Sequence, residues 1–148
     1  MSDLSDLYQE VILDHGRSPR NFRIMADPTA SAEGLNPLCG DRYQVFVKMD
    51  GDRVADVSFQ GSGCAISKAS ASLMSQVLKG KSAAEAEDLF QRFHKMVVEG
   101  DGSQAEGLGK LAVLKGVADF PTRVKCASLA WHALHAALRG ETQPATTE

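Results

Sequence analysis

Apolar and polar positions alternate along two neighbouring stretches near the middle of the chain, residues 42–49 and 54–60. Alternation with a period of two is typical of a strand that buries one face. The buried positions would be Tyr43, Val45, Val47, Val54, Val57 and Phe59. Phe46 departs from the alternation, and Asp50-Gly51 between the stretches is a strong signal for a tight turn. We therefore predict a β-hairpin, whose two outer ends must be neighbours in space.

Apolar residues recur at helical spacing in four other stretches. These are Asp3–Asp14, Cys64–Leu78, the residues that follow Ser82, and Pro121–Arg139. We expect the first helix to end at His15-Gly16 because Pro19 prevents its continuation. Ser82–Glu85 has the sequence of a capping box, and Pro121 suits the first turn of a helix. A short helix is predicted at 111–114, broken by Gly116.

The remaining segments are rich in residues that interrupt regular structure. Residues 17–37 are expected to be irregular, with a short edge strand at Thr29–Ala32, and Gly100–Gly109 reads as a polar loop. Residues 141–148 are predicted to be a solvated, disordered tail. The whole pattern predicts an α+β fold in one domain, residues 1–140. A small antiparallel sheet of about three strands would be packed by four to six helices.

The composition excludes several classes of protein. The 148 residues have 43% hydrophobic and 24% charged side chains and a net charge of −3, which favours one globular domain without nucleic-acid binding. No apolar run approaches the roughly 18 residues of a membrane span. Met1–Leu13 is a charged amphipathic stretch rather than a signal peptide. We expect a cytoplasmic protein whose three cysteines are reduced.

The three cysteines occupy positions where a thiolate would be useful. A single cysteine is most often a small buried hydrophobic residue. Cys39 and Cys64, however, are flanked by glycines and polar residues, and the predicted hairpin brings them together. Cys64 and Cys126 are expected in the first turns of helices, where unpaired amides and the helix dipole favour a thiolate. The joint pattern favours metal binding.

Asp41 completes a set of four ligands for a thiophilic metal. It lies two residues after Cys39, so in an extended segment both side chains point to one side. Three thiolates and a carboxylate suit tetrahedral zinc, although the spacing of the cysteines matches no C-x-x-C zinc module. A carboxylate exchanges more easily than a fourth thiolate, which predicts a site built for ligand replacement. The histidines lie beside no cysteine and are expected on helix surfaces: His15, His94, His132 and His135.

The sequence around these ligands resembles the SufU proteins, within the wider IscU/NifU amino-terminal family. The resemblance covers Leu4 to about Leu138, and its motifs occur in the same order. The matching stretches are Leu4–His15, Ser18–Asn21, Asn36–Arg42, Phe59–Ser72 and Phe120–Trp131.

This resemblance implies a small antiparallel sheet packed by helices and a role in iron–sulfur cluster assembly. The implied partners are a cysteine desulfurase of the SufS type and downstream assembly proteins. Cys39, Asp41, Cys64 and Cys126 would bind zinc, and Cys39 would leave the metal and take up sulfane sulfur. Arg123 would orient the loop or bind the incoming persulfide. The implied activity is that of a zinc-dependent sulfurtransferase.

Two alternatives remain open at this point. IscU-type scaffolds carry a histidine immediately before the third cysteine, where this chain has Lys125. That difference favours the sulfur acceptor over a scaffold on which a [2Fe–2S] cluster is assembled, although the same ligands could hold iron. The other alternative is a zinc module whose metal only stabilises the fold.

Overall fold

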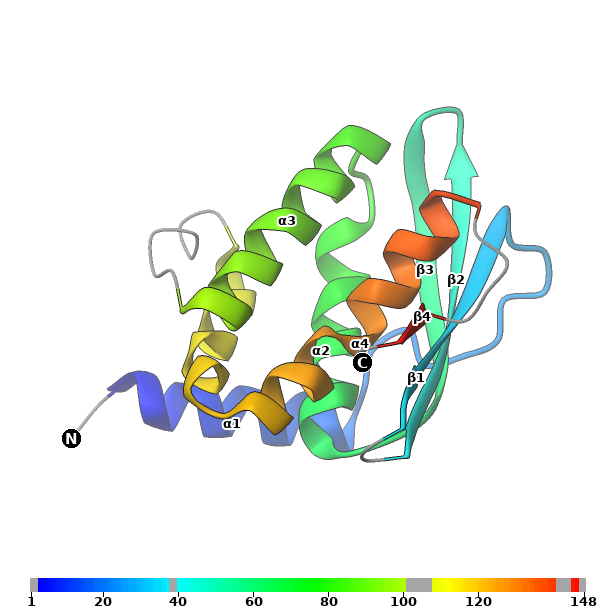
Figure 1. The fold of residues 1–148 in the computed structure, drawn as a ribbon. Helices are drawn as coiled ribbons and strands as arrows, with labels where there is room; N and C mark the ends of the chain where they lie inside the picture. Colours follow the sequence, from blue (N-terminus) through cyan, green and yellow to red (C-terminus); the bar gives the residue numbers. More distant parts are fainter. Residues whose placement is uncertain (1–2, 38–39, 101–107, 141–144, 147–148) are drawn as a thin grey trace.

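The computed structural model describes residues 3–37, 40–100, 108–140 and 145–146. In these ranges the helices pack on one face of a small sheet, and α4 (Pro121–Leu138) lies directly against β1 (Ala30–Asn36) and β2 (Asp41–Asp50) (Figure 1). The other elements are α1 (Asp3–Arg17), β3 (Arg53–Ser62), α2 (Ala65–Leu78), α3 (Ala83–Glu99), the 3₁₀ helix η2 (Gly109–Asp119) and β4 (Ala145–Thr146).

The strands of the sheet are ordered β3-β2-β1-β4. β2 pairs antiparallel with both β1 and β3, whereas the two residues of β4 run parallel to β1. Three antiparallel strands packed by four α-helices and a 3₁₀ helix confirm the predicted α+β fold. At one end of the sheet the register sets Asn36 opposite Asp41 and Arg42 opposite Ser62, so three chain segments meet there.

The predicted hairpin is confirmed as β2 and β3. Its alternating apolar side chains are buried on the helix-covered face, where Tyr43, Val45, Val47, Val57 and Phe59 are each 0% exposed. Phe46, which broke the alternation, is also buried, and so is Ser58 opposite it. The second face of the hairpin is therefore partly covered as well, which explains why its strands are more apolar than a strict alternation requires.

β1 is longer than the predicted strand at Thr29–Ala32. It continues through Gly34 to Asn36, because Gly34 allows the strand to pack closely on α4. A Cβ atom at Gly34 would lie only 3.2 Å from Leu129 and 3.3 Å from the Cβ of Ala133. This strand has few large apolar side chains, so its period was not visible in the sequence.

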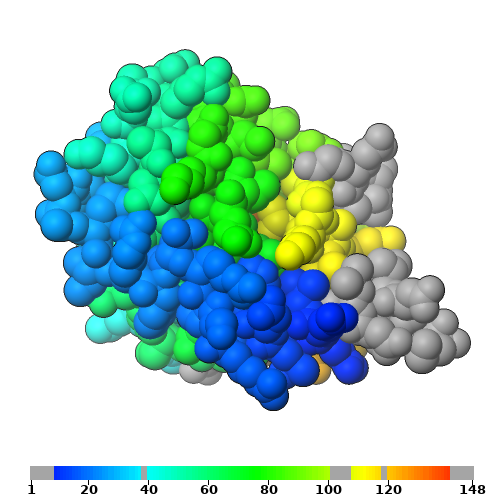
Figure 2. Space-filling view, turned by 180° about the vertical axis from the view of Figure 1, so that it is seen from behind, coloured from blue at the N-terminus to red at the C-terminus, as the bar shows by residue number. Residues whose placement is uncertain are grey.

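α1 extends to Arg17, and the prediction that it ends at His15-Gly16 was wrong. His15 is 1% exposed, and its Nδ1 lies 2.7 Å from Oγ of Ser72 in α2. The same hydroxyl accepts the backbone N–H of Arg20, so the chain after α1 is also held on α2. Figure 2 shows this N-terminal region lying across α2 and beside η2.

Two further predictions differ from the structure near the C-terminus. The predicted break at Gly116 is absent, because η2 continues through it from Gly109 to Asp119. Within the predicted tail, Ala145 and Thr146 pair with β1. Residues 101–107, 141–144 and 147–148 lie outside the described residues, as does Cys39.

The interior between the helices and the sheet is built around Trp131. Its ring stacks on Phe93 of α3 with centroids 4.5 Å apart, and its Nε1 donates to Oγ of Ser70 at 3.2 Å. The capping box at Ser82 and Glu85 is present at the start of α3, as predicted. No helix in the described ranges is long and apolar enough to cross a membrane.

Candidate metal centre

Three predicted ligands converge at the end of the sheet where β2 begins. Ligand atoms of Asp41, Cys64 and Cys126 all lie within 4.8 Å of one another, and no other such group occurs among the described residues. They come from the first residue of β2, the residue before α2, and α4 (Figure 1). Cys39 falls outside the described residues, so its place in the site stays a prediction.

Cys64 is the N-cap of α2. Its φ of −73° and ψ of 171° are extended, and its Sγ accepts the backbone N–H of Ser67 at 3.4 Å. A thiol therefore occupies the role usually taken by a serine or aspartate oxygen. Cys64 is exposed, so this side of the site is open to an approaching molecule. The prediction that Cys64 begins the helix is confirmed.

Cys126 lies deeper, at 5% exposure. It is the sixth residue of α4, which begins at Pro121, and so it lies beyond the four unpaired amides of the helix start. The expected stabilisation of its thiolate by the first turn was therefore wrong. Its position beside Asp41 follows from the packing of α4 on β1 and β2.

Asp41 is 4% exposed, and its Oδ2 is buried without a hydrogen-bond partner. A buried carboxylate oxygen without a donor or cation is costly. The two thiols near this carboxylate complete a donor set that suits zinc and could also bind iron. The residues present therefore fit a metal ion.

A polar wall borders the ligands on the side of Gly63. The hydroxyls of Tyr43 and Ser67 lie 2.9 Å apart, and Ser67 donates to the carbonyl of Cys64 at 3.0 Å. A Cβ at Gly63 would lie 2.5 Å from Ser67 Oγ, 2.6 Å from Tyr43 Oη and 2.9 Å from Asp41 Oδ1. Any side chain at position 63 would thus collide with this wall.

Burial raises the pKa of Tyr43 to about 12, and the hydrogen bond with Ser67 acts in the opposite direction. The phenol is therefore protonated at neutral pH and can donate. Sequence reasoning treated Tyr43 as core and gave Ser67 no role. The one available signal was the position of Ser67 three residues after Cys64, which is typical of a residue that pairs with an N-cap.

The remaining candidate residues have other surroundings. Arg123 is exposed, and its guanidinium lies 4.5 Å from the ring centroid of Phe120. His15 is buried against α2, so its expected place on a helix surface was wrong. The other three histidines gather around Phe90 on α3 and α4.

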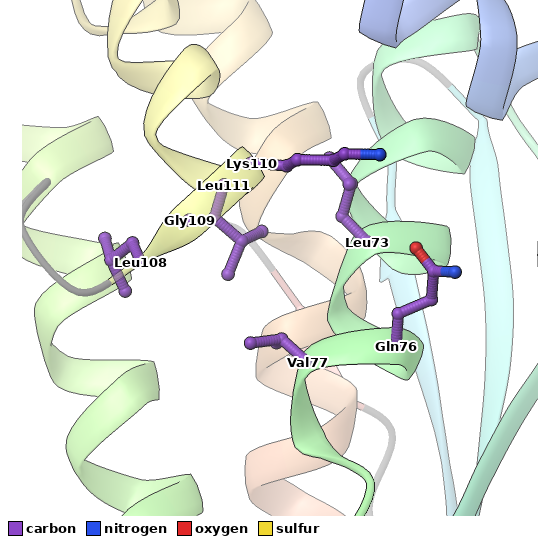
Figure 3. Close-up of a pocket in the computed structure, with 7 residues that line it drawn as sticks. All are labelled: Leu73, Gln76, Val77, Leu108, Gly109, Lys110 and Leu111. Atoms are coloured by element: carbon purple, nitrogen blue, oxygen red, sulfur yellow. The ribbon is translucent and has the colours of Figure 1, made fainter.

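A separate pocket of about 240 Å³ lies between α2 and η2. Figure 3 shows that its lining is apolar apart from Gln76 and Lys110, with Leu73 and Val77 on α2 and Leu108–Leu111 opposite. Leu73 is about 13 Å along α2 from Cys64 at 1.5 Å per residue. The pocket therefore does not belong to the metal centre.

These features define a small α+β protein that presents two thiols and a carboxylate at one end of a sheet. The family described as NifU-like N terminal domain matches residues 7–140. The chain belongs to this family, as predicted.

Three relatives illustrate the family. The zinc-dependent sulfurtransferase SufU of Bacillus subtilis (strain 168) is 42% identical over 90% of each chain. The iron–sulfur cluster assembly scaffold protein IscU of Streptococcus pyogenes serotype M1 is 40% identical over 94% of this chain and 87% of its own. The crystal structure of a NifU-like protein (N-terminal) from Brucella abortus superposes with a TM-score of 0.83, at 27% identity over 93% of this chain and 96% of that one.

Proposed function

We propose that this chain is a zinc-dependent sulfur acceptor. It takes persulfide sulfur from a cysteine desulfurase of the SufS type and relays it for iron–sulfur cluster assembly in the cytoplasm. The observation that carries the proposal is the convergence of ligand atoms of Asp41, Cys64 and Cys126 within 4.8 Å of one another. The name of the B. subtilis relative supports the choice of zinc and of sulfur transfer.

Cys39 is the fourth ligand and the acceptor thiol in this proposal. The described residues on either side of it are held together, because the N–H of Gly40 donates to the carbonyl of Asn36 at 2.8 Å. Gly40 has a φ of 73°, which a glycine adopts without strain. The residues that flank Cys39 are thus fixed at the end of the sheet where Asp41 lies. A bound zinc ion would keep the site's thiols deprotonated and guarded against oxidation.

The transfer step is a thiol–disulfide exchange. The thiolate of Cys39 attacks the terminal sulfur of the partner's cysteine persulfide and forms a new S–S bond. The S–S bond of the donor persulfide breaks, and the partner's cysteine leaves as a thiolate. Sulfane sulfur moves without any net oxidation or reduction. Arg123, exposed three residues before Cys126, would attract the anionic persulfide.

The test uses zinc-loaded protein, a SufS-type desulfurase and labelled cysteine. The wild-type chain should acquire one labelled persulfide and accelerate the partner's turnover. Cys39→Ser should lose both effects. The control variant Ser58→Ala, which changes a residue of β3, should retain them. Normal sulfur uptake by Cys39→Ser would contradict the assignment.

A second function is favoured by the S. pyogenes relative, whose name is that of a scaffold. Two thiolates and a carboxylate could also hold iron. Anaerobic reconstitution with iron and sulfide separates the two functions. A stable visible chromophore that can be passed to an apo-ferredoxin supports the scaffold, and its absence alongside zinc retention supports the acceptor.

A further inference from the structure

Asn36, the last residue of β1, has a buried side-chain amide without a partner. The residue is 1% exposed, and neither its Oδ1 nor its Nδ2 has a hydrogen-bond partner. Buried polar side chains are normally hydrogen-bonded, so an amide with both atoms unpaired calls for an explanation. Its position beside the metal centre provides one.

The register of the sheet sets Asn36 directly opposite Asp41. Two residues earlier on the same face, Gly34 is opposite Tyr43 and faces Leu129 of α4. Because side chains alternate along a strand, Asn36 and Asp41 both lie on the face covered by the helices. Directly opposed residues in an antiparallel pair have Cβ atoms about 4.5–5.5 Å apart, within reach of a side-chain hydrogen bond.

The unpaired atoms of the two residues are complementary. Oδ2 of Asp41 is an acceptor without a donor, and Nδ2 of Asn36 is a donor without an acceptor. The other carboxylate oxygen, Oδ1, lies toward Gly63, the residue before Cys64. The carboxylate thus has one oxygen on the side of Gly63 and the other buried without a partner.

We propose that Asn36 is the positioning residue of Asp41 in the metal-bound protein. Its Nδ2–H donates to Oδ2, which would leave Oδ1 of Asp41 to hold the metal ion. Hydrogen bonds from neighbouring residues commonly orient the carboxylates that bind metals. This inference rests on the metal site of the proposed function and adds the residue that directs its carboxylate.

Asn36→Leu removes the amide at similar volume. The zinc dissociation constant, measured by competition with a chromophoric chelator, should rise about 10- to 100-fold. In an Asp41→Ala background the same substitution should change it by less than about twofold, because the two effects depend on one interaction. Ser58→Ala removes another buried, unpaired polar group and should leave zinc affinity unchanged.

Unchanged affinity in folded Asn36→Leu, or an equal loss in both backgrounds, would overturn the role of Asn36. Failure of the wild-type chain to bind zinc would instead overturn the proposed metal site. A measurement on the wild type covers the case in which Asn36→Leu does not fold. Zinc should slow hydrogen exchange of the Asn36 side-chain NH₂ in NMR spectra, with Asn36→Gln assigning the signal. No slowing, or the same slowing in Asp41→Ala, would also reject the inference.

Discussion

The two halves of α4 each bring ionisable side chains into the interior, but the partners of these side chains differ. Near its start, Cys126 lies beside the carboxylate of Asp41, one oxygen of which is buried and unpaired. Further along, His132 and His135 pack against the ring of Phe90 on α3, with centroids 5.7 and 4.4 Å from it. Of these two regions, only the first has a buried carboxylate oxygen without a hydrogen-bond partner.

This difference shows which feature of a buried cluster indicates a ligand. In the cluster of histidines, burial lowers the pKa of His132 to about 4, with smaller contributions from His94 and His135. The ring is therefore neutral and is stabilised by packing. Nε2 of His135 lies 2.9 Å from Oε1 of Glu87, although the contact lacks hydrogen-bond geometry. The cluster of histidines is explained by aromatic packing, whereas the carboxylate beside the two thiols has a buried oxygen that packing does not explain.

The largest expected effect is a loss of stability in Trp131→Ala, a variant that should leave metal binding intact. Trp131→Ala removes a side chain that is 0% exposed and stacked on Phe93, which should lower the free energy of unfolding by about 3–5 kcal/mol. Denaturant unfolding measures this loss. The variant, where it remains folded, should still bind one zinc ion. A loss of unfolding free energy below about 1 kcal/mol would contradict the prediction and show that the packing relaxes around the missing ring.

Zinc should stabilise the chain through the metal centre alone. At a free concentration 100 times its dissociation constant, one bound ion raises the free energy of unfolding by about 2.7 kcal/mol. Thermal unfolding with and without zinc measures the gain. At the same zinc concentration the gain should be smaller in Asp41→Ala and unchanged in His94→Ala. Equal gains in all three proteins would place the metal elsewhere.

Acid should act on the cluster of histidines. Below pH 6.5 the unfolded chain binds a proton at His132, but the folded chain does not until about pH 4. Stability must therefore fall as the pH falls through this window. The shift corresponds to at most roughly 3 kcal/mol, and partial exposure of the ring reduces it to about 2 kcal/mol.

Burial also lowers the pKa of His15, which adds to the loss in the same direction. His132→Gln should weaken the dependence of stability on pH between 4 and 6.5, and His15→Gln should weaken it separately. Urea unfolding at several pH values gives the slopes. A slope that His132→Gln leaves unaltered would assign the acid sensitivity to other groups.

The smallest effect is expected from Tyr43→Phe at the metal centre. It removes the hydrogen bond to Ser67, but Ser67 retains the carbonyl of Cys64 as an acceptor. The free energy of unfolding should fall by about 1 kcal/mol. A loss above about 3 kcal/mol would mean that Tyr43 also supports Asp41, which zinc titration of the variant would then reveal.

Local signals were sufficient for α2, α3 and the hairpin. These signals are the capping box at Ser82, the turn at Asp50-Gly51 and the periods of the apolar residues. They act between residues that are close in the chain, so they can be recognised in the sequence without knowledge of the fold. β1 lacked such a signal. Its Gly34 is needed because α4 packs closely against the strand, and this contact involves residues that are distant in the sequence. The end of α1 was misplaced for a similar reason, since His15 is held by Ser72, which is distant in sequence.

The sequence alone determined the types of ligand, the family and the elements that carry them. A thiol at an N-cap and a carboxylate at a strand start are properties of short segments. Tertiary structure alone decided that Cys126 reaches Asp41, and that Asn36 and Tyr43 lie beside the ligands. These relations depend on strand register and on the docking of α4, which arise from packing between segments far apart in the chain.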